Sequence, residues 1–223
     1  MGVYLPRWVW VGAGLLACAS GMVNVVGYLS FEHQAVSNMT GATTLLGGAL
    51  AHGDLQASLH LSAVMGAFVT GAMLSGIIIQ DSTLQLGRRY GVALMLTSLL
   101  LFAAIPLFQR HLLFGAVLAA MACGLQNAMA TTFSGAVIRT SHLSGMFTDL
   151  GIALGHALRK MPLQTRRLRL CLLVVVTFFC GAVCGGWLFM QLDYLALLVP
   201  ASATGLTGFG YIAYTHLHRR AGD

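Results

Sequence analysis

The chain has 223 residues, of which 57% are hydrophobic and 8% are charged, and its formal net charge is +6. Soluble domains carry about 25% charged residues, so this composition excludes a soluble globular protein and indicates one that lies in a lipid bilayer. The positive charge does not indicate nucleic-acid binding, because the basic residues gather between and after apolar runs, as the positive-inside rule predicts.

Six apolar runs are long enough to cross a hydrocarbon core of about 30 Å as helices. In chain order they are Trp8–Leu29, Ala57–Ile79, Tyr90–Leu107, Leu112–Ala130, Leu170–Met190 and Tyr194–Tyr214. The first run resembles a lipoprotein signal up to Cys18 but continues to Leu29, so we expect it to stay in the fold. Pro200 predicts a kink in the last run. The sequence therefore predicts an all-α polytopic membrane helical bundle.

A polar, glycine-rich stretch follows the first run of each half of the chain. Ser37–His52 recurs as Ser141–His156 after a shift of 104 positions. The identical positions are Ser37/Ser141, Gly41/Gly145, Thr44/Thr148, Gly47/Gly151, Ala49/Ala153, Leu50/Leu154 and His52/His156. Flanking blocks match in the same order: Gly21 and Asn24 match Gly124 and Asn127 at an offset of 103, and Phe68–Gly76 matches the block from Phe178 at an offset of 110. We infer a single membrane domain, residues 1–223, made of two repeats at about 8–107 and 112–214.

Basic residues discriminate between two topologies. If both copies of the repeated stretch cross the membrane, there are eight spans, and nine of the 12 basic residues lie on one side. If neither copy crosses, there are six spans. Eleven of the basic residues then lie on one side of the membrane, and only Arg110 lies on the other. The second distribution favours six spans plus two re-entrant or short helices, with both termini cytoplasmic. The two halves then have opposite orientations and form an inverted repeat, while the eight-span topology stays open.

Inverted repeats with short, glycine-interrupted segments at matching places are typical of secondary transporters that bind solutes near the membrane midplane. A half-helix that starts inside the membrane directs unpaired N–H groups and a partial positive charge into a shared cavity. We therefore expect a small-solute secondary transporter or channel whose site lies between the repeats. The alternative is a membrane scaffold or regulatory protein without transport activity, which would need only small-residue helix faces.

The sequence contains no metalloprotease, hydrolase or P-loop motif, so we do not expect an enzyme or any catalytic residue. The five cysteines lie in apolar runs without CxxC spacing, and we expect neither a bound metal nor a cofactor. The expected partners are the lipid bilayer and an unidentified small solute, but no nucleic acid. Homo-oligomerisation is left open.

Candidate substrate- or ion-binding residues are the polar side chains of the repeated stretch and the two matched amides. They are Asn24, Thr40, Thr44, Asn127, Ser144, Thr148 and Asp149. The structural alternative is that the hydroxyls bond carbonyls at tight helix crossings and that the amides make interhelical hydrogen bonds.

Asp149 is the only acidic residue in either copy, and Leu45 stands at its counterpart. An intramembrane carboxylate is costly unless it is paired or hydrated, so we expect it to face the interior near Arg139 or His142. His52 and His156 are expected to satisfy helix C-terminal carbonyls, with proton relay as the alternative.

Two groups of motifs carry a family resemblance. Ser37-Asn38-Met39-Thr40-Gly41 stands in the first half, and Gly124-Leu125-Gln126-Asn127-Ala128 and Thr148-Asp149-Leu150-Gly151 stand in the second. In this order and spacing they resemble the YoaK-like family of bacterial multi-pass membrane proteins, which carry a domain of unknown function. The resemblance covers essentially the whole chain and implies the bacterial inner membrane, but it supplies no substrate. One departure is Asn24, where many members carry Asp.

Overall fold

The computed structural model describes residues 7–30, 33, 35–79, 88–133, 141–163 and 165–220, and the regular elements among them are all helical. The long helices are α1 (Arg7–Leu29), α3 (Leu55–Ile79), α4 (Arg88–Gln109), α5 (Leu113–Phe133), α7 (Thr165–Leu192) and α8 (Leu198–Arg220). The short ones are α2 (Met39–Ala51), α6 (Leu143–Leu158) and the 3-10 helix η1 (Asp193–Leu197). The predicted all-α class is confirmed.

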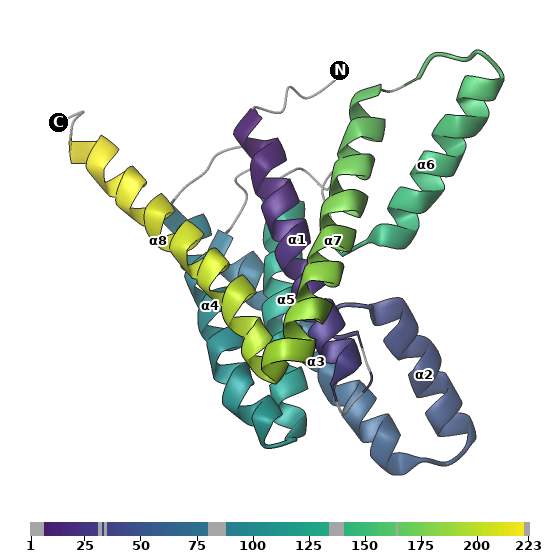
Figure 1. Cartoon of the computed structure of the whole chain (residues 1–223), viewed down its shortest axis with the longest axis vertical. Helices are drawn as coiled ribbons and strands as arrows, with labels where there is room; N and C mark the ends of the chain where they lie inside the picture. The colour runs from purple at the N-terminus through teal and green to yellow at the C-terminus, as the bar shows by residue number, and fades with distance from the viewer. Residues whose placement is uncertain are drawn as a thin grey trace.

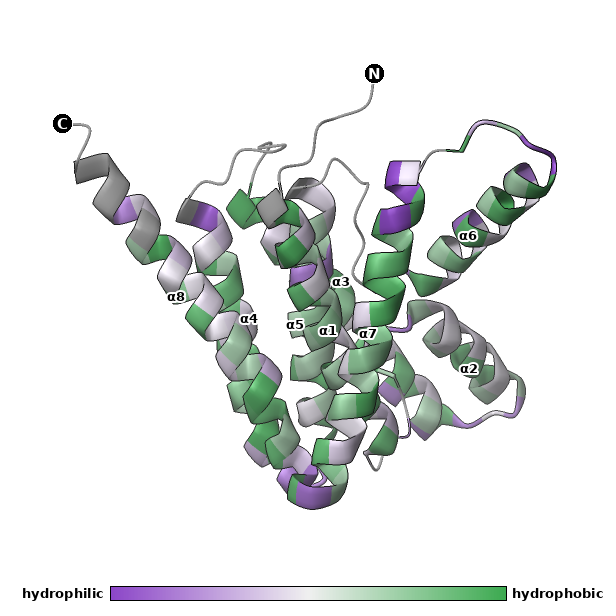
Figure 2. Cartoon of the chain, turned by 45° about the horizontal axis from the view of Figure 1, so that its top comes forward, coloured by the Kyte–Doolittle hydropathy of each residue, from purple (hydrophilic) through white to green (hydrophobic). Residues whose placement is uncertain are grey.

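Five helical stretches of the described chain are long and apolar enough to cross a membrane. They are Val9–Leu29, Leu55–Ile79, Arg89–Gln109, Leu113–Thr132 and Thr165–Ala213. The last stretch covers 49 residues and contains α7 and the larger part of α8, between which the chain reverses direction at η1 (Figure 1). Hydrophobic residues line the lengths of the helices, and hydrophilic ones gather at the turns (Figure 2). This arrangement is that of a polytopic membrane protein.

The crossing of α1 and α7 depends on glycine. A Cβ atom at Gly21 would collide with the carbonyl oxygen of Phe178 on α7, and one at Gly181 would collide with that of Cys18 on α1. Each helix therefore presents a glycine to the backbone of the other. Without side chains at these points, the two backbones approach closely along their length, which is how small residues drive helix association in lipid.

The crossing of α3 and α5 is built in the same way. A Cβ atom at Gly71 would collide with the carbonyl oxygen of Met121, and one at Gly124 would collide with that of Phe68. The α1–α7 and α3–α5 pairs lie side by side in the bundle, and α5 also packs against α4 (Figure 1).

Two polar side chains join helices inside the bundle. Gln126 on α5 is buried, and its Nε2 donates to the carbonyl oxygen of Leu16 at 2.8 Å and to the hydroxyl of Ser20 at 3.0 Å, both on α1. The hydroxyl of Ser98 on α4 donates to the carbonyl oxygen of Ala201 on α8 at 2.7 Å. Such buried groups find partners because water is not available there.

The short helices α2 and α6 form hairpins with α3 and α7 at one edge of the bundle (Figure 1). At 1.5 Å per residue, helices of 13 and 16 residues are shorter than the roughly 30 Å hydrocarbon core. Their N-terminal ends lie near each other about halfway along the bundle, and they run from there toward opposite ends (Figure 1). The structure thus brings the two copies of the repeated stretch together at their first residues.

Candidate solute cavity

A partly open cavity of about 350 Å³ lies between the N-terminal ends of α2 and α6 and the second half of α5. This volume is within the usual range of small-molecule sites, about 300–1,000 Å³. The lining is mainly hydroxyl, amide and imidazole side chains, with a few apolar ones. The lining residues are Ser37, Asn38, Met39, Thr40, Phe68, Asn127, Ala128, Thr131, Thr132, Ser141, His142, Leu143 and Ser144.

The start of α2 is fixed by two sets of hydrogen bonds. Asn38 is the N-cap, and its side chain accepts from the N–H of Gly41 at 3.1 Å, which satisfies one of the unpaired donors of the first turn. The N–H and the hydroxyl of Ser37 both donate to Oδ1 of Asn24 on α1, each at 3.0 Å. Asn24 therefore does not line the cavity but positions the segment that does.

The start of α6 has a weaker version of the same arrangement. Its N-cap is His142, whose side chain makes no capping hydrogen bond. The first-turn bond from the N–H of Met146 to the carbonyl oxygen of His142 is 3.4 Å long, whereas the matching bond from Ala42 to Asn38 in α2 is 2.9 Å. The imidazole lies against Gly145, where a Cβ atom would collide with it.

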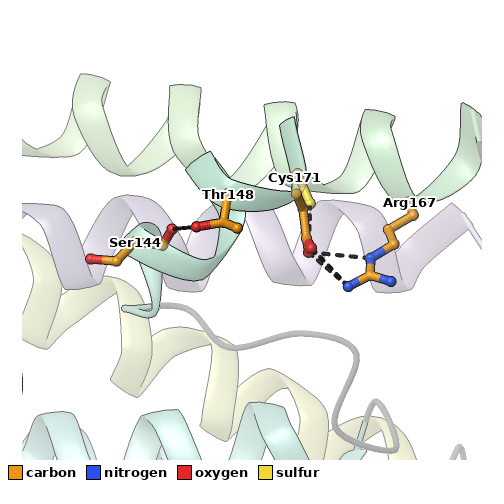
Figure 3. Close-up of polar contacts among 5 residues, drawn as sticks. Ser144, Thr148, Arg167 and Cys171 are labelled. Atoms are coloured by element: carbon orange, nitrogen blue, oxygen red, sulfur yellow. Dashed lines mark hydrogen bonds and ion pairs between the residues drawn. The ribbon is translucent and has the colours of Figure 1, made fainter. Parts of the chain in front are cut away.

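Three of the predicted binding residues line the cavity: Thr40, Asn127 and Ser144. Thr44 and Thr148 lie one turn further along their helices and do not. Their hydroxyls donate to the carbonyl oxygens of Thr40 and Ser144, each at 3.0 Å, and Figure 3 shows the second of these bonds. For these two threonines the structure supports the alternative in which the hydroxyl bonds a backbone carbonyl, here within its own helix.

Asp149 also lies outside the cavity and forms an ion pair with Arg167 at the start of α7. Nη2 of Arg167 lies 2.9 Å from each carboxylate oxygen, and Nε lies 3.2 Å from Oδ2. The thiol of Cys171, one turn further along α7, lies 3.9 Å from Oδ2 (Figure 3). The carboxylate side chain is 29% exposed and that of Arg167 is 61% exposed, so the pair lies at the surface of the bundle.

The partners expected for Asp149 were Arg139 and His142. Arg139 lies outside the described residues, and His142 is the N-cap of the same helix. Arg167 was not expected to pair with Asp149, because the positive-inside rule already explains a basic residue in this loop. The sequence signal for the pairing was the position of Arg167 just after the loop between α6 and α7, since the two helices of such a hairpin face each other.

The remaining predicted features have local roles. Nδ1 of His52, the C-cap of α2, lies 2.8 Å from the carbonyl oxygen of Gly48, so this histidine satisfies a helix C-terminal carbonyl as expected. Over the described part of the chain, no group of three or more His, Cys, Asp or Glu side chains is placed to hold a metal ion.

Comparison with known protein families identifies a match over most of the chain. Residues 12–210 match a family described as "Protein of unknown function (DUF1275)". No curated protein and no solved structure matches the chain.

Proposed function

Because the chain belongs to the DUF1275 family, a family of unknown function, we propose a function from the cavity itself: the protein is a small-solute secondary transporter or channel of the bacterial inner membrane. The observation that carries this proposal is a cavity of about 350 Å³ between the starts of two half-length helices. A polar solute loses its hydrogen bonds to water when it enters the membrane. Hydroxyl and amide groups halfway through the membrane replace these bonds, which lowers the free-energy barrier to crossing.

The matched helix contacts support two repeats around this cavity. The contact of Gly21 with Phe178 corresponds to that of Gly124 with Phe68, when the offsets of 103 and 110 are applied. A second matched pair gives the same result: Gly181 with Cys18 corresponds to Gly71 with Met121. Each crossing therefore joins one helix from the first repeat to one helix from the second. This is the arrangement expected of a pseudo-twofold axis between the halves.

The chain path supports six crossings with an inverted repeat. The start of α1, the end of α8 and the loop between α6 and α7 lie at one end of the bundle, and the turn that holds Arg110 lies at the other (Figure 1). The loop from Arg159 to Arg169 is rich in basic residues, so the positive-inside rule places that end in the cytoplasm. In this topology α2 and α6 approach the midplane from opposite sides.

The two helix starts also determine the electrostatics of the proposed site. Each α-helix carries a partial positive charge at its N-terminus, and the N-terminal ends of α2 and α6 both border the cavity. Broken helices of transporters hold their substrates with such ends. In our proposal Thr40, Ser144 and Asn127 contact the solute, whereas Asn24 and Asp149 hold the segments that carry these residues.

Osmotic swelling of proteoliposomes, followed by stopped-flow light scattering, tests this function with urea, glycerol and formate as probes. We expect the protein to accelerate swelling with at least one probe, and Ser144→Trp to abolish the acceleration by filling the cavity. Leu206→Trp is the control, because Leu206 is 73% exposed on the outer surface of α8. Swelling no faster than that of empty vesicles, or equal rates for the two variants, would contradict the proposal.

One observation favours the alternative of a scaffold or regulatory protein. Glycines on α2 and α6 have open space where a Cβ atom would stand: Gly47, Gly48, Gly151 and Gly155. Exposed small-residue faces of this kind associate with other helices in lipid. If this function is correct, Gly151→Leu releases a co-purifying membrane protein or dissociates an oligomer, and Ser144→Trp does neither.

A further inference from the structure

We infer that the turn between α6 and α7 binds an anionic phospholipid, with basic side chains on its phosphate and apolar side chains beside its acyl chains. The turn lies at the far end of α6 from the cavity (Figure 1). The inference therefore goes beyond the proposed function and does not depend on transport. It is carried by the charge of the turn, by its exposed apolar residues and by the backbone at Lys160.

The turn concentrates positive charge without an acidic residue. Residues 159–169 contain five basic residues and neither Asp nor Glu. The carboxylate of Asp149 pairs with Arg167 at 2.9 Å, whereas Arg159 and Lys160 directly follow α6 with exposed side chains. Guanidinium and ammonium groups bind phosphate oxygens through charge-assisted hydrogen bonds. The end of α6 thus offers two cationic groups to an anionic headgroup.

Apolar side chains stand exposed among these charges. Leu158 is 87% exposed, and Met161 and Leu163 are also exposed. Figure 2 shows hydrophobic and hydrophilic residues mixed along this turn. At a membrane surface, apolar side chains enter the acyl region while Lys and Arg reach the headgroups. The turn therefore fits both parts of a phospholipid, and not only a soluble anion.

Lys160 has a backbone conformation that favours glycine. Its φ is +55°, and its N–H donates to the carbonyl oxygen of Ala157 at 3.0 Å, while that of Met161 donates to His156 at 2.9 Å. These two bonds form a Schellman motif. α2 ends with the same pair of bonds, but the left-handed residue there is Gly53. A side chain in this region costs stability relative to glycine, so α6 keeps a charge where the fold favours glycine.

Membrane topology alone does not account for these features. The positive-inside rule concerns the number of basic residues at one end of the bundle, and it requires neither a lysine at a glycine position nor exposed apolar neighbours. Arg88 and Arg89 begin α4 at the same end of the bundle, because Gly91 lies against Gly208 in the second half of α8 (Figure 1). They provide a control with the same charge in a different place.

Tryptophan quenching by brominated lipids tests the site. The full chain, with Trp8, Trp10 and Trp187 replaced by Phe, carries a single tryptophan at Leu158→Trp in phosphatidylcholine vesicles. We expect phosphatidylglycerol with brominated acyl chains to bind beside this tryptophan about threefold more tightly or more than brominated phosphatidylcholine. Leu112→Trp, at the opposite end of the bundle, is expected to give a ratio near one.

Two double variants separate a site from a diffuse surface charge. Arg159→Gln with Lys160→Gln is expected to lower the phosphatidylglycerol preference to near one. Arg88→Gln with Arg89→Gln removes the same charge from the same end and is expected to keep the preference. Lys160→Gly is expected to unfold at a higher temperature than the parent and to lose part of the preference, because it removes both the strained backbone and the charge.

Equal binding of the two brominated lipids beside Leu158→Trp would overturn the site. Equal losses in the two double variants would also overturn it, since they would show a diffuse surface potential. Displacement of the lipid by excess inorganic phosphate would show a site for a soluble anion instead. Swelling rates are measured separately, so each of these results leaves the proposed function standing.

Discussion

Asn24 and Asp149 both influence the cavity from outside it, each through the segment that it holds. Asn24 binds Ser37 before the start of α2, and Asp149 binds Arg167 beside α6. The first contact is made by an amide oxygen that accepts two bonds, and the second is an ion pair at a partly exposed place. Their replacement should therefore have different effects on stability.

Asn24→Leu removes the acceptor oxygen and leaves the Ser37 N–H and hydroxyl without it. Ser37 is buried, and a buried donor that loses its partner costs about 1–3 kcal/mol. Asn24→Asp keeps an oxygen that accepts both bonds. We expect thermal unfolding in detergent to occur at a lower temperature in Asn24→Leu and near the parent temperature in Asn24→Asp. Equal melting temperatures for the two variants would contradict the positioning role.

Asp149→Asn keeps the size of the side chain and removes its charge. Exposed ion pairs contribute roughly 0–1 kcal/mol, so we expect little change in the melting temperature but a clear change in the swelling rate. Expression and thermal unfolding are measured beside solute flux in the same preparation. A misfolded variant would show that the residue is structural, and a stable variant with parental flux would show that the carboxylate is merely solvated.

The close packing of the helices depends on glycines that contact the backbone of the neighbouring helix. Gly21 and Gly181 do this between α1 and α7, and Gly71 and Gly124 do it between α3 and α5. Gly66 on α3 is different, because nothing lies within 4 Å of the place of its Cβ atom. The same substitution should therefore have opposite effects at the two kinds of site.

Gly181→Ala is expected to destabilise the protein by about 1–3 kcal/mol, because the added methyl group forces α7 away from the carbonyl oxygen of Cys18. Gly66→Ala is expected to stabilise it by roughly 0.5–1 kcal/mol, because alanine is the better helix former. Denaturant unfolding in mixed micelles gives both values. Loss of stability in Gly66→Ala equal to that in Gly181→Ala would contradict this account of the crossings.

Hydropathy and the repeat predicted most of the elements, but several boundaries were set by residues outside the apolar runs. α7 begins at Thr165, five positions before its predicted apolar run, because Arg and Leu are good helix formers in water. Pro200 was expected to kink the last span. Instead η1 ends at Leu197 and Pro200 falls in the first turn of α8, where its missing N–H has no partner to lose.

The candidate site was predictable where it depended on local sequence, and less so where it depended on tertiary contact. The repeated stretches Ser37–His52 and Ser141–His156 were predicted to form short helices that start at a shared cavity, and the structure places their first residues at the cavity. The hydroxyls of Thr44 and Thr148 donate to backbone carbonyls of their own helices. Whether a threonine makes this bond depends on its side-chain rotamer, which the residue type alone does not determine. The pairing of Asp149 with Arg167 spans 18 positions and required the hairpin geometry.

In the proposed six-span topology, the α2–α3 turn and the α6–α7 turn lie on opposite sides of the membrane. Gln56→Cys and Met161→Cys report on these two turns, since both side chains are exposed. We expect an impermeant thiol reagent added to intact cells to label Gln56→Cys alone, and Met161→Cys to react only after the membrane is opened. Labelling of both from the same side would favour eight spans.

Water access to the middle of the bundle shows whether a solute pathway passes between the two half-helices. A cysteine reacts as its thiolate, which forms in water and not in lipid. Ser144→Cys lines the cavity, whereas Leu206→Cys faces outward from α8, so an impermeant aqueous thiol reagent applied to proteoliposomes compares a wet site with a lipid-facing one. We predict that Ser144→Cys reacts about tenfold faster or more. Equal, slow reaction at both positions would show that no solute pathway passes between the two half-helices.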